Sequence, residues 1–361
     1  MGKIVSKTFG FGMIGCGVIS KAHISQILQI ENARLVAVAD EVSHKAEELG
    51  KEYEVDWYSD YRELLSRDDI DIVNIVTPSG MHADITIEAA RAGKHVLVEK
   101  PMDVTLEKAQ AMIQACKEAN VKLSIISQHR FDPSTVRVYK DIQEGKLGDM
   151  ILGQASVNWY RTQQYYDSGE WRGTWALDGG GALMNQSIHT IDLLQYLMGP
   201  VESVFAHTAT LAHERIEVED VAVATVTFKN GGLGTIVGTT SAYPGLSARL
   251  EVFGKKGTAV IDSDVLTHYY LQTDEQQGGL YRVDNVENLA VTSSSNGQTG
   301  SANPSDISVN GHRSQIIDMI QAIEENREPM VNGEEGLKPL EIILAIYQSA
   351  RTGQPVTLPL Q

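Results

Sequence analysis

The start of the chain limits the possible folds most, because an apolar strand, a glycine loop and a helical pattern follow one another there. The run from Thr8 to Gly15 leads into Gly15-Cys16-Gly17-Val18-Ile19-Ser20. Gly15 permits a tight turn, and Gly17 lets the backbone approach a pyrophosphate at the N-terminus of the helix. Ser20 stands where the usual pattern has a third glycine. The candidate cofactor-binding residues of this loop are Gly15, Cys16, Gly17, Val18 and Ile19.

A second apolar strand, Arg34 to Asp40, ends on an acidic residue 25 positions after Gly15. An acid at this place accepts hydrogen bonds from the adenosine ribose and repels a 2'-phosphate. No arginine that could bind such a phosphate follows closely. Asp40 therefore predicts NAD rather than NADP as the cofactor. The alternatives are an NADP-dependent reductase, or a glycine turn and a surface aspartate without a ligand.

A third feature is a buried strand that ends on a lysine, His95 to Pro101. Val96 to Val98 read as a strand covered on both faces, and Pro101 cannot donate to a continuing ladder. Ligands bind outside the carboxyl ends of parallel strands, so Lys100 is a candidate for chemistry in a cleft. The alternative is a lysine that only caps a sheet edge.

The strands and helices of this half alternate. Strand Ile70 to Val76 leads into Thr77-Pro78 and then into a helix from about Ala83, with His82 at its start. His82 either borders the nicotinamide or hydrogen-bonds the loop. Further candidates for cofactor contact are Thr77, Pro78, His82, Glu99 and Lys100. Helix 105–119 and strand 122–127 complete a doubly wound α/β domain over residues 1–127.

The pattern changes after residue 128. A helix from Pro133 to Glu144 and a strand from Ile151 to Trp159 precede long alternating segments, which predict a mainly antiparallel open sheet in an α+β domain of residues 128–361. These segments are 201–211, 220–228, 233–242, 248–253 and 258–261. The free face of this sheet is suited to association between copies. The last helices are expected at 312–325 and 336–351, and the C-terminal helix can pack back on the first domain. The loop 292–305 has a low-complexity sequence.

Two stretches of the second half are candidates for substrate contact. The segment 159–175 mixes aromatic rings with two arginines, which suits stacking on a sugar and pairing with an anion, although an aromatic core is the alternative. The segment 178–194 begins with three glycines, and Asn185 and His189 share one face of the expected helix because they are four residues apart. A core histidine is the alternative for His189. The candidate substrate-binding residues are Asn185, Arg161, Arg172, Trp171 and Tyr160.

Charge and cysteine content exclude several classes of function. The formal net charge of -17 argues against nucleic acid or an anionic membrane as a partner. No apolar run approaches the length that spans a bilayer, and the two cysteines form neither a disulfide framework nor a metal motif. We expect a cytoplasmic protein that acts on small molecules and has no metal site.

Taken together, Gly15-Cys16-Gly17, Asp40, Glu99-Lys100-Pro101 and the glycine-preceded helix with His189 resemble the glucose-fructose oxidoreductase, inositol dehydrogenase and rhizopine catabolism (Gfo/Idh/MocA) family. The resemblance covers essentially the whole chain. It implies a Rossmann domain, an α+β substrate domain whose open sheet makes homodimer or homotetramer contacts, and NAD(P)-dependent oxidation of sugars or polyols. It also implies that Lys100 is the catalytic lysine, with a cis bond to Pro101, and that His189 transfers the proton.

Within that family, inositol dehydrogenases have an aspartate where this chain has Asn185, which disfavours myo-inositol. The segment Trp171 to His189 is more similar to the branch that contains UDP-N-acetylglucosaminuronate 3-dehydrogenases. Glucoside 3-dehydrogenases and levoglucosan dehydrogenases are similar in plan. The predicted reaction is therefore oxidation of a ring hydroxyl, at C3, of a hexopyranose or nucleotide-linked sugar. The alternative from another class is a sugar or nucleotide sensor without catalysis, against which the presence of both Lys100 and His189 argues.

Overall fold

The chain folds as two units whose segments alternate along the sequence. The computed structural model describes residues 7–272, 286–290 and 309–360. Unit 1 comprises Met1–Gln128, Trp175–Gly179 and Ile307–Leu340, and unit 2 comprises His129–Thr174, Gly180–Asp306 and Glu341–Gln361. The stretch 1–127, expected from the sequence to form the first domain, lies within unit 1. The low-complexity loop 292–305 lies outside the described residues.

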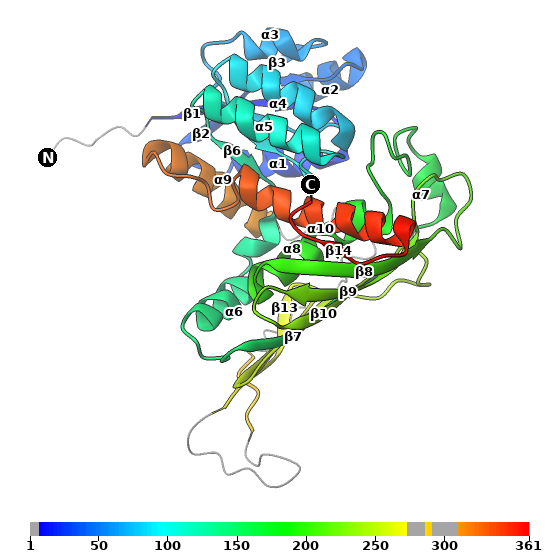
Figure 1. The fold of residues 1–361 in the computed structure, drawn as a ribbon. Helices are drawn as coiled ribbons and strands as arrows, with labels where there is room; N and C mark the ends of the chain where they lie inside the picture. Colours follow the sequence, from blue (N-terminus) through cyan, green and yellow to red (C-terminus); the bar gives the residue numbers. More distant parts are fainter. Residues whose placement is uncertain (1–6, 273–285, 291–308, 361) are drawn as a thin grey trace, which may run out of the picture. The chain divides into compact units, whose positions relative to one another are not determined.

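The sheet of unit 1 is parallel, in the order β3-β2-β1-β4-β5-β6 (Figure 1). Its strands are β1 (Phe9–Ile14), β2 (Ala33–Ala39), β3 (Asp56–Tyr58), β4 (Ile72–Ile75), β5 (His95–Val98) and β6 (Leu123–Ile125). The strand order reverses between β1 and β4, and ligands of doubly wound sheets bind at that point, beyond the carboxyl ends of the strands. This confirms the predicted doubly wound domain.

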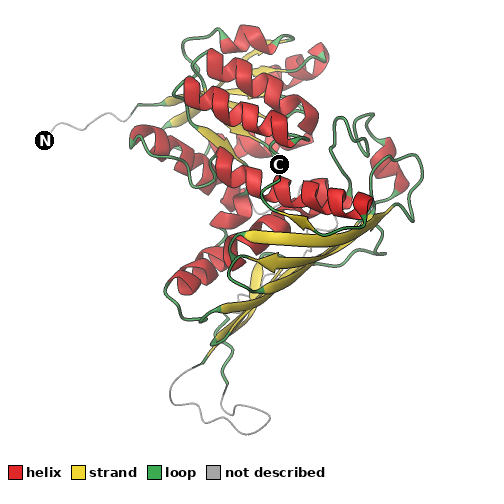
Figure 2. Ribbon diagram, in the orientation of Figure 1, coloured by secondary structure: helices red, strands yellow, loops and turns green. Residues whose placement is uncertain are grey.

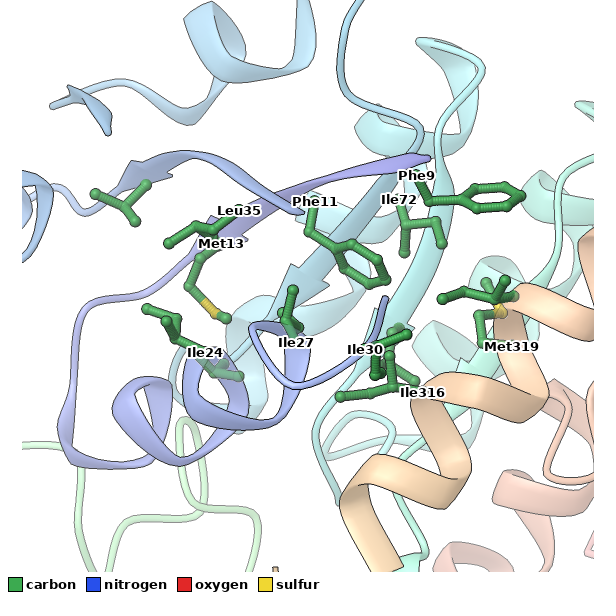
Figure 3. Packing of buried hydrophobic residues seen from close by; sticks show 14 of the residues in the cluster. Phe9, Phe11, Met13, Ile24, Ile27, Ile30, Leu35, Ile72, Ile316 and Met319 are labelled. Atoms are coloured by element: carbon green, nitrogen blue, oxygen red, sulfur yellow. The ribbon is translucent and has the colours of Figure 1, made fainter. Parts of the chain in front are cut away.

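Strand β1 determines how the helices pack on this sheet, because large side chains alternate with glycine along it. Phe9, Phe11 and Met13 point to one face, where residues of α1, α2 and α9 cover them (Figure 3). On the opposite face the backbone of Asp69 approaches β1 closely, because a Cβ on Gly10 would lie 1.9 Å from the carbonyl oxygen of Asp69. The helices of unit 1 are α1 (Val18–Ile27), α2 (Ser43–Tyr53), α3 (Tyr61–Leu65), η1 (Ser79–Met81), α4 (His82–Arg91), α5 (Leu106–Glu118), α9 (Val309–Glu324) and the first part of α10 (Gly333–Thr352).

Unit 2 contains a sheet in the order β13-β12-β11-β7-β10-β9-β8-β14, antiparallel except where β10 pairs with β7 (Figure 2). The predicted mainly antiparallel sheet is therefore confirmed, while β13 and β14 had not been predicted. Its strands are β7 (Met150–Asn158), β8 (Val201–Ala209), β9 (Val221–Phe228), β10 (Leu233–Thr239), β11 (Ala248–Gly254), β12 (Gly257–Asp262), β13 (Val265–Leu271) and β14 (Val356–Thr357).

One face of this sheet is covered by helix α8 (Ile188–Met198), which packs on β7 and β11. The approach is close, because a Cβ on Gly153 of β7 would lie 2.7 Å from side-chain atoms of Leu194 and Met198. Helix α6 (Pro133–Gln143) packs beside α8. The shorter helices are η2 (Gln128–Phe131), α7 (Gln163–Asp167) and η3 (Ala182–Ser187). In the part of the chain that the structure describes, none of the helices has the length and apolar character needed to cross a membrane.

Candidate active site

The glycine loop between β1 and α1 has the backbone that its sequence predicts. Gly15 has φ +101°, and a Cβ there would lie 2.7 Å from the carbonyl oxygen of Val76. Gly17 is the N-cap of α1, makes no side-chain cap hydrogen bond, and a Cβ on it would meet nothing within 4 Å. Open space beside Gly17 and a helix N-terminus without a side-chain cap together form an arrangement that can bind a phosphate.

Asp40 holds this loop in place. Its Oδ2 accepts a hydrogen bond of 2.8 Å from the backbone N–H of Cys16, and its Oδ1 accepts one of 2.8 Å from the N–H of Val42. A carboxylate has about four acceptor sites, so it can also accept from a ribose. Burial raises the pKa of the Cys16 thiol to about 12, so this residue contributes its backbone rather than a thiolate. Glycine-bounded space, an uncapped helix N-terminus and a carboxylate at the end of β2 together fit NAD.

Lys100 follows the carboxyl end of β5 and is half-buried, and its bond to Pro101 is cis, as the resemblance implied. Glu99 accepts a hydrogen bond from the Lys100 N–H at 3.0 Å, and its other oxygen lies 2.8 Å from Nε2 of His23. Although burial favours the protonated acid, the hydrogen bond and charge of His23 hold the pKa of Glu99 well below its usual value. Glu99 is thus a buried anchor for the backbone that carries Lys100.

His82 fastens two loops of unit 1. Its Nδ1 lies 2.9 Å from the carbonyl oxygen of Pro101, and its Nε2 lies 2.9 Å from that of Thr77. The ring is buried. Of the two roles considered for His82, the structure shows the hydrogen bonds to the loops. Contacts of Thr77, Pro78 and His82 with the cofactor remain predictions.

In unit 2, the segment that carries Asn185 and His189 differs from the expected single α-helix. Residues Ala182–Ser187 form a π-helix, and Ser187 Oγ donates to the carbonyl oxygen of Ala182 at 2.7 Å. Single π turns are frequent at functional sites. From Gly181 through Gln195, all of which the structure describes, every residue is buried except Asn185 and His189. An otherwise buried segment therefore leaves one amide and one imidazole partly accessible.

The glycines before this segment serve internal packing. A Cβ on Gly181 would lie 1.9 Å from the carbonyl oxygen of Glu219, and one on Gly180 would lie 2.1 Å from Oη of Tyr347. Glu219 accepts hydrogen bonds from the N–H groups of Gly181 and Leu183 and from the Tyr347 hydroxyl. Burial raises the pKa of Glu219 to about 7, although these donors favour the ionised form. The close approach at these glycines is thus made by the protein's own backbone and by a tyrosine.

The predicted arginines join Asn185 in one hydrogen-bonded network. Arg161 is buried and donates to Gln186 at 2.9 Å, and the Gln186 amide donates to Asn185 at 3.1 Å and to the Tyr165 hydroxyl at 3.0 Å. Arg172 donates to the same hydroxyl at 2.7 Å. The guanidinium of Arg172 lies 4.4 Å from the ring centroids of Tyr165 and Trp171, which are cation–π contacts.

Tyr160, the remaining substrate-binding candidate, is half-buried and packs edge-on against Tyr243, with 5.3 Å between the ring centroids.

Sequence reasoning missed Gln186 and Glu219. Their local sequence gave little signal, because Gln186 stands between the polar residues Asn185 and Ser187 and Glu219 stands next to Asp220.

His129 was also missed, although it lies beside His189. The two rings are 5.0 Å apart between centroids with an interplanar angle of 79°. Next to it, Arg130 makes a two-pronged ion pair with Asp192, at 2.8 Å from Nε and 2.6 Å from Nη2. Asp192 is buried. It joins α8 to the turn that carries His129.

Two sets of three side chains in the described residues have potential metal-ligand atoms within 4.8 Å of one another. They are His23, Glu99 and His312, and His129, Asp132 and Asp264. In both sets a ring nitrogen lies within hydrogen-bonding distance of a carboxylate oxygen, and we therefore describe them as hydrogen-bonded clusters.

Comparison with known proteins identifies both halves of the chain. Residues 9–127 match the family described as "Oxidoreductase family, NAD-binding Rossmann fold", and residues 140–358 match "Oxidoreductase family, C-terminal alpha/beta domain" (GFO_IDH_MocA).

Among solved structures, the WlbA dehydrogenase from Bordetella pertussis in complex with NADH and UDP-GlcNAcA is similar, with 36% identity over 98% of this chain and 100% of that chain and a TM-score of 0.83. The Myo-inositol 2-dehydrogenase of Thermotoga maritima is 27% identical over 96% of this chain and 98% of its own length. The levoglucosan dehydrogenase of Pseudarthrobacter phenanthrenivorans is 27% identical over 70% of this chain and 73% of its own length.

The glycine loop, Asp40 and Lys100 thus lie in a matched NAD-binding domain, and Asn185 and His189 lie in the matched C-terminal domain. The chain belongs to the Gfo/Idh/MocA oxidoreductase family and is an NAD-dependent sugar or polyol oxidoreductase that acts on CH–OH groups.

Proposed function

We propose that the protein oxidises a secondary ring hydroxyl, at C3, of UDP-N-acetylglucosaminuronate or a closely related nucleotide-linked sugar acid. One observation carries the proposal: Asn185 and His189 are the half-buried residues of an otherwise buried segment, and hydrogen bonds link Asn185 through Gln186 to Arg161. A hydroxyl-binding amide and base are thus connected to cationic groups suited to an anionic substrate. The similarity to the WlbA dehydrogenase, which was solved with UDP-GlcNAcA, supports the same substrate class.

In this proposal the His189 ring accepts the proton of the substrate hydroxyl, and the Asn185 amide orients that hydroxyl. The Lys100 ammonium stabilises the developing alkoxide, an effect that can contribute a few kcal/mol in a site that excludes water. A base whose pKa is near neutrality adds about 100-fold or more. NAD supplies the hydride acceptor.

The remaining candidates would bind the rest of the substrate. Arg172 would pair with a carboxylate or phosphate, and it is already oriented by the Tyr165 hydroxyl and the Trp171 ring. Trp171 and Tyr160 would pack against the apolar face of the sugar or the base. Arg161 is more deeply buried and would act through Gln186.

The test is to incubate the protein with NAD and each candidate sugar and to follow the absorbance of the reduced cofactor. We expect turnover with UDP-N-acetylglucosaminuronate, and no turnover by Lys100→Met although NADH still binds. Lys51→Met is the matched control, because Lys51 lies on the exposed surface of α2, where it pairs with Glu47.

Other outcomes of this test identify the alternatives. Turnover of levoglucosan or a glucoside, without turnover of the nucleotide-linked acid, would favour a 3-dehydrogenase of simple sugars. Binding of NADH and sugar without turnover of any candidate would favour a sensor. Full activity of Lys100→Met would remove this lysine from the mechanism.

We also infer that copies of the protein associate through the free face of the unit 2 sheet. Phe205 of β8, Val223 of β9 and Leu233 of β10 are exposed, and their strand pairing places them on the same face. Charged substitution at Val223, as in Val223→Lys, should convert a dimer or tetramer into a smaller species in light scattering. A monomeric wild type would contradict this inference.

A further inference from the structure

We propose that His129 is a positioning residue for His189: clamped as a cation by Asp132 and Asp264, it orients the neighbouring ring and keeps that ring neutral. The proposal rests on the proposed role of His189 as the proton acceptor. It assigns a supporting role to His129, Asp132 and Asp264, which lie outside the helix that carries His189.

The geometry shows a ring held on one side and in contact with His189 on the other. Nδ1 of His129 lies 2.8 Å from Oδ2 of Asp132 and 3.1 Å from Oδ1 of Asp264. The side chain of His129 is 15% exposed. Its ring meets that of His189 edge to face, at 5.0 Å between centroids. Any rotation of His129 would break the contacts with both carboxylates.

The clamp is built from two elements that are far apart in the sequence. Asp132 is the N-cap residue of α6, and Pro133 follows it at the first helical position. Asp264 lies in the turn between β12 and β13 with φ +67°, after Ser263 with φ +47°. Ser134 joins the two elements, because its Oγ donates to the carbonyl oxygen of Asp264 at 2.7 Å and accepts from the N–H of Leu266 at 3.1 Å.

Two carboxylates at one ring nitrogen favour the imidazolium form of His129. Burial alone would favour the neutral ring, but Asp264 and Asp132 outweigh it and raise the pKa of His129 to about 10. A positive charge within about 4–6 Å disfavours a second positive charge. The cation of His129 therefore offsets the two carboxylates that clamp it, and so favours the neutral form of the neighbouring His189 ring, which is the form that can accept a proton from a hydroxyl.

Other charged or titratable groups on the elements of unit 2 that pack with α8 have partners of their own. Two side chains of α6 contact aromatic rings: Tyr139 stacks on Tyr196, and the Arg137 guanidinium lies over the Tyr269 ring. Two others form ion pairs: Lys140 pairs with Glu144, and Asp141 pairs with Lys146. In β11, Arg249 pairs with Glu251 and with Asp262. On α8 itself, Asp192 pairs with Arg130. Strand β7 carries no titratable side chain.

The direct test measures the titration of His189 by NMR in the full-length protein with NADH bound. Ring resonances of 13C-labelled histidines are followed against pH in the wild type, His129→Gln and Asp264→Asn, and the His189 signal is assigned with His189→Gln. We expect the His189 midpoint to rise by about one pH unit in His129→Gln, because the cation is lost and both carboxylates remain. We expect a smaller fall in Asp264→Asn, because one negative charge is lost and the cation remains.

Asn is tolerated at positive φ, so Asp264→Asn preserves the turn even if His129→Gln were to destabilise unit 2. His44→Gln, at an exposed position of α2 in unit 1, is the matched control and should leave the midpoint unchanged. The acidic limb of the kcat/KM profile should move in the same two directions. Unmoved midpoints in both variants, or equal shifts of one sign, would overturn the proposal. Absence of turnover in the wild type would instead refute the proposed function, while the titration would remain readable.

Discussion

The buried ion pair between Arg130 and Asp192 offers a sharp test of how unit 2 is held together. Both side chains are almost fully buried, at 1% and 2% exposure, and two hydrogen bonds of 2.8 and 2.6 Å join them. Asp192→Asn keeps the shape of the side chain but removes its charge. It also turns an amide N–H group toward one guanidinium N–H group. Arg130 is then left as a buried cation without its counter-charge.

The expected cost follows from burial. Removing one partner of a buried pair costs about 3–5 kcal/mol, because the remaining charge is poorly solvated. The pair of Arg215 with Asp167 is the matched control, since it has the same fork geometry at 3.3 and 2.7 Å but 60% and 41% exposure. An exposed pair contributes about 0–1 kcal/mol. Asp167→Asn should therefore cost several kcal/mol less than Asp192→Asn.

The measurement is unfolding by urea and by heat at fixed protein and NADH concentrations. For a unit of this size, about 3–5 kcal/mol corresponds to a fall in Tm on the order of 10 °C. Asp192→Asn should also lower kcat, because Asp192 ties α8, which carries His189, to the turn of His129. Equal losses in the two variants, or a loss below about 1 kcal/mol in Asp192→Asn, would refute the argument from burial.

Three further predictions follow from the site. Asp40→Ala should weaken NADH binding about tenfold or more, because a hydrogen bond to a charged group contributes about 1.5–3 kcal/mol. The same substitution should weaken NADPH binding less. Fluorescence titration measures both affinities, and equal losses for the two cofactors would contradict this prediction. The folded-state pKa of His129, about 10, lies above its ordinary value, so its stabilisation is complete below about pH 6.5 and is lost as pH rises toward 10. The urea midpoint of unfolding should therefore fall with rising pH over this range in the wild type, and should fall less in His129→Gln. Parallel plots of the midpoint against pH for the two proteins would argue against this role of His129. Arg172→Met should raise KM for a nucleotide-linked acid about tenfold or more and change KM for a neutral sugar little, which steady-state kinetics can decide.

Much of unit 1 could be predicted from local patterns. The alternation of large residues with glycine in β1, the turn at Gly15 and the proline after Lys100 each restrict the backbone within a few residues. Parallel strands that are buried on both faces read as continuous apolar runs, and β4 and β5 do so. Helices α2 and α3 were not predicted, although α2 is as long as α1 and α4.

The candidate site of unit 2 was predicted only in part. Asn185 and His189 could be found because they are polar residues at a helical spacing in an apolar stretch. The π-helix could not, since its hydrogen bonds depend on the close approach of the Glu219 backbone to Gly181. Gln186 was overlooked because its partners depend on tertiary structure. An α-helical spacing gives no indication that this side chain joins Arg161 to Asn185.

The sequence by itself determined the strand and helix order, the glycine turn at the phosphate-binding position, and the acid at the end of β2, because each depends on neighbouring residues. Tertiary structure alone decided which distant charges meet. Asp264 reaches His129, and Asp192 reaches Arg130, from positions 135 and 62 residues away in the chain. Such pairs are set by the packing of a hairpin and a helix around one core, and burial then makes the choice of partner energetically decisive.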